Sequence, residues 1–161
     1  MIQLTDKQVI EYFKKSYTSV DGLWFMKIEE QADFDTALQI DNKVWEIMPK
    51  IQARMLKSMS DSKNEFEALL ECLSTKLSLE GFSFTVEDNI KADNFSIAIN
   101  NCPWHNLMIK SKRAGLSGKV GSVVCNSEYN VWAKEFGDNI TFKLGEQICT
   151  GFKSCILHFS R

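Results

Sequence analysis

The 161-residue chain lacks the features of a secreted, membrane-spanning or nucleic-acid-binding protein. Its 19 Lys and Arg residues face 21 Asp and Glu residues, whereas surfaces that bind nucleic acids or anionic membranes normally carry a basic excess. No apolar run approaches the roughly 18 residues of a membrane span, and residues 1–15 alternate charged and apolar side chains without the apolar core of a secretory signal. We therefore expect a cytoplasmic protein that binds neither nucleic acid nor membrane.

The chain also has only 2 proline residues and no low-complexity tract, repeat or Pro/Gly/Ser-rich linker. We expect a single domain over residues 1–161, with a helical half at 1–81 and a mixed half at 82–161. A core of this size needs no disulfide or metal to fold, so the 5 cysteines require another explanation. In a reducing compartment an odd number of cysteines indicates free thiols, metal ligands or nucleophiles.

Helical periodicity dominates the first half of the chain. A capping box at Thr5 to Gln8 predicts a helix at about 6–18, and Gly22 separates it from a second helical piece at 23–31. A third helix starts after Asp33 and should kink or restart at Pro49. A second capping box, at 62–65, predicts a helix that ends at Gly81.

The pattern then changes to the two-residue alternation of strands. Apolar residues alternate at 82–86 and 95–99, and the polar segment 87–94 between them predicts a hairpin connection. Helices are expected near 104–113 and 117–136, followed by strands at 140–144 and 155–159. The predicted fold is α+β, with N-terminal helices followed by a ββααββ unit that forms a four-stranded antiparallel sheet.

The most informative pattern is a set of four cysteines at the ends of strands or on the helix between them: Cys102, Cys125, Cys149 and Cys155. Cys149 and Cys155 flank one hairpin loop, and the other two can reach the same end of the sheet if the long helix packs across it. Four thiolates suit Zn²⁺ or an iron–sulfur cluster. The alternatives are redox or nucleophilic cysteines, or inert packing, which we expect for Cys72.

A second group surrounds Cys102, which is followed by Pro103, Trp104 and His105. A Cys-Pro pair beside histidine can serve haem iron, a less favoured cofactor here, and His105 could instead complete a Cys/His metal site. The plain alternative is a strand end with Trp104 covering the sheet edge. We expect His158 to be a structural strand residue.

The long helix places Cys125, Glu128, Tyr129 and Trp132 on one face, at successive helical spacings. A carboxylate one turn from a thiolate can bind metal, orient a ligand or act as a general acid or base. Alternatively, this aromatic stripe is part of the core.

Trp24, Lys27 and Glu30 recur every three residues in the second helical piece, beside an apolar stretch at 23–26. The charged side chains of Lys27 and Glu30 either line a ligand pocket or form an ordinary ion pair on the solvent-exposed face of an amphipathic helix. A basic segment with three glycines, at 110–121, could bind a small anion or be a solvated face.

At these residues the chain resembles a mostly uncharacterised prokaryotic family described as 2-aminothiazoline-4-carboxylic acid hydrolase-like. The resemblance lies in residues 17–30, 44–54 and the segment from Cys102 to Cys155. The C-terminal half is also similar in element order to the 4-vinyl reductase type of small-molecule-binding domain, in which cysteines near the last hairpin hold zinc.

The resemblance implies a pocket between the cysteine site and the N-terminal helices, and hydrolysis of a cyclic amidine or thiazoline carboxylate. In that case Glu128 is the expected general base, and Lys27 holds a substrate carboxylate. The expected pocket residues are Trp24, Glu30, Trp104, Tyr129 and Trp132. The alternative is a ligand sensor or assembly partner with structural zinc, and a second copy of the chain is a candidate partner.

Overall fold

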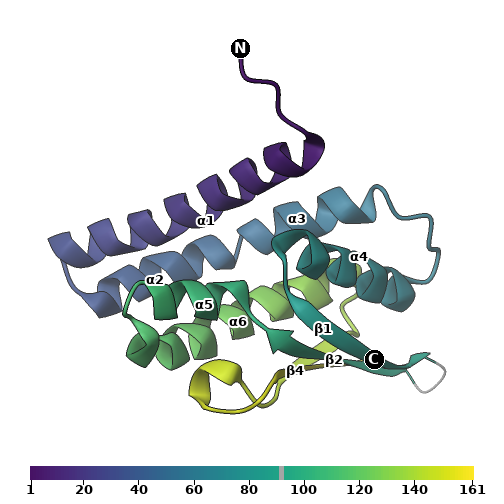
Figure 1. Ribbon diagram of the computed structural model, residues 1–161. Helices are drawn as coiled ribbons and strands as arrows, with labels where there is room; N and C mark the ends of the chain where they lie inside the picture. The colour runs from purple at the N-terminus through teal and green to yellow at the C-terminus, as the bar shows by residue number, and fades with distance from the viewer. Residues whose placement is uncertain (91–92) are drawn as a thin grey trace. The chain divides into compact units, whose positions relative to one another are not determined.

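The computed structural model describes residues 1–90 and 93–161 (Figure 1). The chain folds into two compact units, Met1–Asp41 and Asn42–Arg161. The helices between residues 48 and 80 belong to the second unit because they pack in the same core as the later elements, and the single domain expected over residues 1–161 stays a prediction.

The first unit contains the long helix α1 (Asp6–Gln31) and the start of α2 (Phe34–Trp45). The predicted capping box is confirmed, since the Gln8 backbone N–H donates to the Thr5 hydroxyl and the Thr5 N–H donates to the Gln8 side chain. The predicted break at Gly22 is wrong, since α1 runs through it. Glycine weakens a helix by only about 1 kcal/mol relative to alanine and keeps its N–H donor, so it need not end one.

The helices α3 (Met48–Lys57) and α4 (Glu65–Glu80) belong to the second unit. The predicted restart at Pro49 is confirmed, with the proline in the first turn of α3. The N-cap of α4 is Asn64 rather than the predicted Ser62, because the Asn64 side chain accepts from the backbone N–H groups of Phe66 and Glu67. Gly81 ends α4 in the left-handed conformation at φ 81°.

The remaining elements confirm the α+β prediction. Strands β1 (Ser83–Asn89) and β2 (Asn94–Asn101) precede α5 (Pro103–Lys110) and α6 (Ala114–Phe136), and β3 (Thr141–Leu144), the short 3₁₀ helix η2 (Ile148–Thr150) and β4 (Cys155–Ser160) complete the chain. The four strands are antiparallel in the order β1-β2-β4-β3. The predicted connection at 87–94 is shorter than expected because β1 continues to Asn89, and its residues 91–92 lie outside the described part of the chain.

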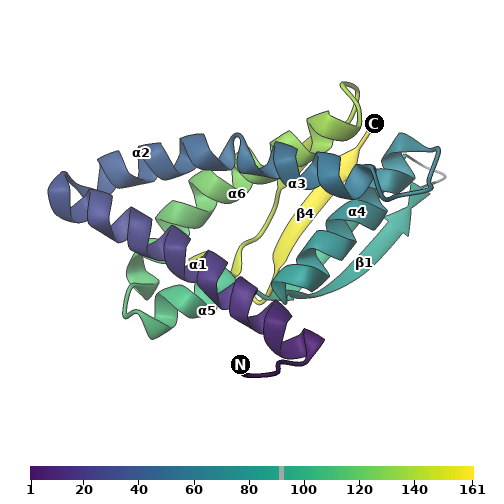
Figure 2. The ribbon, with the colours of Figure 1, turned by 90° about the horizontal axis from the view of Figure 1, so that it is seen from above.

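Helices α4 and α6 cover one face of this sheet (Figure 2). Alternate residues of β2 are buried against them, and the core joins the aromatic and aliphatic side chains of both layers, including Phe66, Leu73, Phe95, Trp132 and Phe159. None of the helices in residues 1–90 and 93–161 has the length and apolar character needed to cross a bilayer.

The strand register decides which strand ends lie side by side. β2 and β4 are antiparallel neighbours, with Ile99 opposite Cys155. The last residues of β2 therefore lie beside the first residue of β4. This arrangement brings segments more than 50 residues apart in sequence to one corner of the sheet.

Candidate functional site

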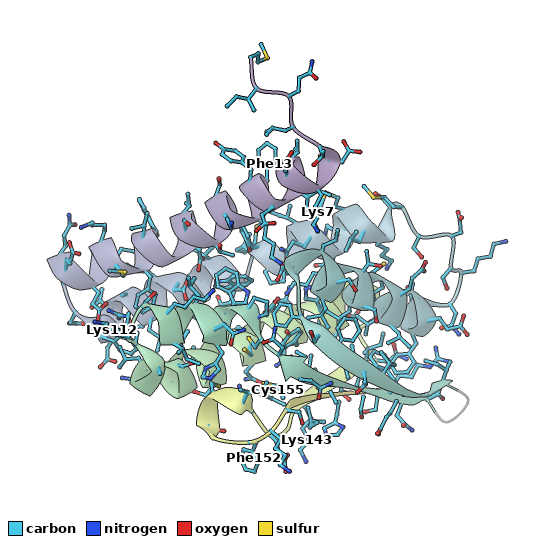
Figure 3. The ribbon with its side chains drawn as sticks, viewed as in Figure 1. Lys7, Phe13, Lys112, Lys143, Phe152 and Cys155 are labelled. Atoms are coloured by element: carbon cyan, nitrogen blue, oxygen red, sulfur yellow. The ribbon has the colours of Figure 1, made fainter. Side chains whose placement is uncertain are left out.

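The four predicted cysteines come from four elements around this corner. Cys102 is the N-cap of α5, and Cys125 lies on α6. Cys149 lies in η2 and Cys155 begins β4, at the base of the loop that carries η2 (Figure 3). All four are free thiols that are partly covered by the protein.

Their electrostatic environment shows that the thiols are neighbours. Burial raises the pKa of Cys125 well above its ordinary value, and charge on Cys102, Cys155 and Cys149 would raise it further. Burial raises the pKa of Cys102 to about 11, although N–H groups at the start of α5 oppose the shift. Burial also raises the pKa values of Cys149 and Cys155. Without a bound cation the four side chains are neutral thiols at neutral pH, which is unfavourable for nucleophilic chemistry.

Two glycines let the η2 segment approach α6 closely. A Cβ atom at Gly121 would lie 2.8 Å from the Cys149 sulfur and 4.0 Å from the Cys125 sulfur. A Cβ atom at Gly118 would lie 3.1 Å from the Cys149 carbonyl oxygen. Both sulfurs therefore lie against the same glycine, and a Cβ there would displace the Cys149 side chain.

Backbone N–H groups point at two of the sulfurs. The His105 N–H lies 3.5 Å from the Cys102 sulfur, at the N-terminus of α5. The Ile148 N–H donates to the Cys155 sulfur at 3.2 Å. Such donors favour the thiolate form, which is the form that binds metal.

A largely buried cluster of three charged side chains lies next to the cysteines. Lys76 of α4 is 3% exposed and forms ion pairs with Glu80 on its own helix, at 3.0 Å, and with Glu128 on α6. The ammonium also lies over the rings of Phe82, at 5.4 Å, and Tyr129, at 5.7 Å. Burial by itself would lower the pKa of Lys76, but the carboxylates of Glu128 and Glu80 outweigh it and raise the pKa, so the lysine stays charged.

Glu128 connects the buried ion pairs of Lys76 to the four cysteines. It lies one helical turn after Cys125, and its charge raises the pKa of that thiol. Burial raises the pKa of Tyr129, with Glu128 and Cys125 adding to the shift. The tyrosine therefore lies within the electrostatic reach of both the ion pair and the thiols.

Sequence reasoning missed Lys76 and Glu80. The detectable signal was that Lys76 falls between Leu73 and Leu77 on the buried stripe of α4, four residues before a glutamate. A lysine on such a stripe needs an anionic partner, and Glu128 on α6 supplies one.

Of the aromatic residues expected in a ligand pocket, Tyr129 and Trp132 are buried, Trp104 is partly buried and Trp24 is exposed. Trp132 is fully buried and stacks on Phe136, although its indole N–H has no hydrogen-bond partner within residues 1–90 and 93–161. Tyr129 packs against Phe142, and Trp104 meets Trp45 edge to face at 5.8 Å. This packing fits the core alternative for the aromatic stripe, and a ligand role for these residues stays a prediction.

Trp24, Lys27 and Glu30 lie on α1 in the first unit, whereas the cysteines lie in the second. Lys27 and Glu30 pair at 2.7 Å with both side chains more than half exposed, which is the amphipathic-helix alternative. Their roles in binding a ligand or a substrate carboxylate stay predictions.

The histidines have other partners. Nδ1 of His105 lies 2.8 Å from the Ser117 hydroxyl, and Nδ1 of His158 lies 2.7 Å from Ser96 on the neighbouring strand. Cys72 is buried in the core as expected. As they stand, no three His, Cys, Asp or Glu side chains in the described ranges have metal-binding geometry, so an ion would have to draw the sulfurs inward to about 2.3 Å.

Comparison with known proteins identifies the family but not its activity. The chain belongs to DUF6125, a family of unknown function, whose pattern matches residues 3–148. No curated protein sequence matches the chain. The match includes Cys102 and Cys125 and reaches into η2, ending one residue before Cys149.

Proposed function

We propose that this DUF6125 protein is a cytoplasmic metal-binding protein in which Cys102, Cys125, Cys149 and Cys155 hold one Zn²⁺ ion or an iron–sulfur cluster. The observation that carries the proposal is the convergence of four thiols from α5, α6, η2 and β4 on one corner of the sheet. Cys102, Cys125 and Cys155 also pack against the hydrophobic core, so inert packing is the alternative that the experiment must separate from metal binding.

Three features support a metal rather than a redox or nucleophilic role. The thiols' raised pKa values leave little thiolate unless a cation is present. The N–H groups of His105 and Ile148 are placed to stabilise thiolate charge. Finally, sulfur ligands select zinc and iron–sulfur clusters over hard cations.

The test is elemental analysis and the visible spectrum of protein purified without oxygen. We expect about one zinc per chain with no visible absorption, or iron with sulfide-to-iron charge-transfer bands. Cys125→Ser should lose most of the metal, whereas Cys72→Ala, which removes a cysteine outside the set, should keep it. Equal traces of metal in the wild type and Cys125→Ser would contradict the proposal.

Hydrolysis of a cyclic amidine or thiazoline carboxylate is the second candidate, supported by the buried Glu128 carboxylate beside Cys125. It requires an open coordination position, because a site closed by four thiolates is normally structural. Metal-loaded protein should then hydrolyse a thiazoline carboxylate, and Glu128→Gln should abolish turnover. Loaded protein without turnover favours the sensor or assembly role with structural zinc.

A further inference from the structure

The ion pair between Lys76 and Glu128 joins α4 to α6 beside the cysteines. Lys76 is 3% exposed and Glu128 is 5% exposed, so water screens neither charge well. The Glu128 charge acts on the Cys125 thiol one turn away, and Lys76 pairs with that same carboxylate, so a change in either charge alters the electrostatics of the sulfurs.

A site of four thiolates and Zn²⁺ carries a net charge of about −2, and so does an oxidised two-iron cluster. In a buried site, a neighbouring carboxylate opposes that charge and a neighbouring ammonium favours it. Glu128 lies one turn from Cys125 on the same face of α6, and Lys76 of α4 pairs with the Glu128 carboxylate.

We propose that Lys76 and Glu128 are positioning residues that set the metal affinity of the four-cysteine site, with Lys76 strengthening binding and Glu128 weakening it. This inference rests on the proposed metal function. The ion pair then serves two purposes, because it also joins two opposite charges that are buried between α4 and α6.

The two partners can be separated because Lys76 has a second carboxylate. In Glu128→Gln, the lysine still pairs with Glu80 at 3.0 Å, so the buried cation keeps a partner and the site becomes more positive. In Lys76→Met, Glu80 and Glu128 remain without the ammonium, so the site becomes more negative. Electrostatic control therefore predicts opposite effects of the two substitutions, whereas structural damage predicts weaker binding in both.

The experiment measures Zn²⁺ affinity of the full chain by competition with a chromophoric chelator, and thiolate coordination by the charge-transfer bands of Co²⁺. We expect about tenfold tighter zinc binding in Glu128→Gln and about tenfold weaker binding in Lys76→Met, as for one unit charge within several ångströms. The Co²⁺ bands should persist in both variants. If Lys76→Met does not fold, the direction of the change in Glu128→Gln decides alone.

A second ion pair joining α3 to the same α6 provides the matched control. Arg54 pairs with Glu135 at 2.7 Å, ten residues after Cys125, and its side chain is 69% exposed. Arg54→Met and Glu135→Gln make the same charge changes and should alter zinc affinity by less than about twofold.

The outcomes separate the two proposals. Weaker or unchanged zinc binding in Glu128→Gln overturns this inference while the metal site stands. Wild-type protein that binds no Zn²⁺ overturns the proposed function and this inference with it. Equal shifts in the Arg54 and Glu135 controls also overturn it, since they would reflect net charge alone.

Discussion

At the scale of single residues, Lys76 departs furthest from what its type predicts. Lysine is rarely buried, and almost never without a partner. Lys76 lies in the interior and has four neighbours of the kind that stabilise a cation, two carboxylates and two aromatic rings. Because the carboxylates raise its pKa against the effect of burial, it remains a cation and must be balanced inside the protein.

We therefore predict that Lys76→Met destabilises the metal-free protein by about 3 kcal/mol, since it removes the ammonium that pairs with the buried Glu128 carboxylate. The double variant with Glu128→Gln should recover much of the loss, because it removes both charges. Urea unfolding of chelator-treated protein measures both values. A double variant as unstable as the single one would show that shape, not charge, sets the cost.

The candidate site was only partly predictable at this scale. The four cysteines were predicted as a set because each lies at a strand end or on the intervening helix. The three-residue spacing of Lys27 and Glu30 allowed two interpretations, a ligand pocket and an ordinary ion pair, and the structure contains the ion pair. Lys76 was missed because helical periodicity predicts which side chains are buried but not which distant residue neutralises one of them.

At the scale of elements, the contact of η2 with α6 depends on two glycines spaced along the helix. A Cβ at Gly121 would lie 2.8 Å from the Cys149 sulfur, so the Cys149 side chain would have to move. Gly115 lies in the first turn of the same helix, where a Cβ would meet nothing within 4 Å.

These surroundings predict opposite results for one substitution at two positions of α6. Gly115→Ala should stabilise the protein by about 0.5–1 kcal/mol through its better helix propensity. Gly121→Ala should destabilise it by about 1–3 kcal/mol and weaken metal binding, because Cys149 is displaced. Thermal unfolding and zinc competition measure these effects, and similar behaviour of the two variants would show that η2 does not depend on this contact.

Element boundaries were predictable where the capping chemistry is local. A capping box of Thr5 and Gln8 begins α1, and Pro49 lies in the first turn of α3. Gly81 ends α4 through its left-handed φ angle. The N-cap of α4 was placed wrongly at Ser62 because two polar residues offered similar chemistry, and the Asn64 side chain reaches two N–H groups instead.

At the scale of the whole molecule, the buried thiols connect stability to pH. In the unfolded chain they ionise near pH 8.5, whereas burial keeps Cys102 protonated up to about pH 11 and raises the pKa of Cys125 as well. The folded state therefore binds more protons above pH 8.5, so stability is complete below that pH and falls as pH rises.

The predicted result is a lower free energy of unfolding at pH 9.5 than at pH 7.5 for reduced, metal-free protein. Urea unfolding at both pH values measures it. A variant with serine at all four site cysteines is the control and should show a smaller fall. An equal fall in the variant would assign the pH dependence to other groups.

Bound metal should also stabilise the whole fold by mass action. At a free zinc concentration about a thousandfold above Kd, the stabilisation is about 4 kcal/mol, or roughly 10 °C in Tm for a chain of this size. Cys155→Ser should remove most of this increase, because it removes one of the four proposed zinc ligands, at the start of β4 beside β2. A Tm that is independent of zinc would contradict the predicted linkage.

The sequence by itself determined the fold class, the order of the elements and the candidate cysteines, because periodicity, caps and turns act over a few residues. Only the tertiary structure decided that β4 lies between β2 and β3, which places Cys155 beside the end of β2. It also decided that Lys76 of α4 meets Glu128 of α6. Both depend on contacts between residues far apart in sequence, and these form only where the packing of helices on the sheet brings them together.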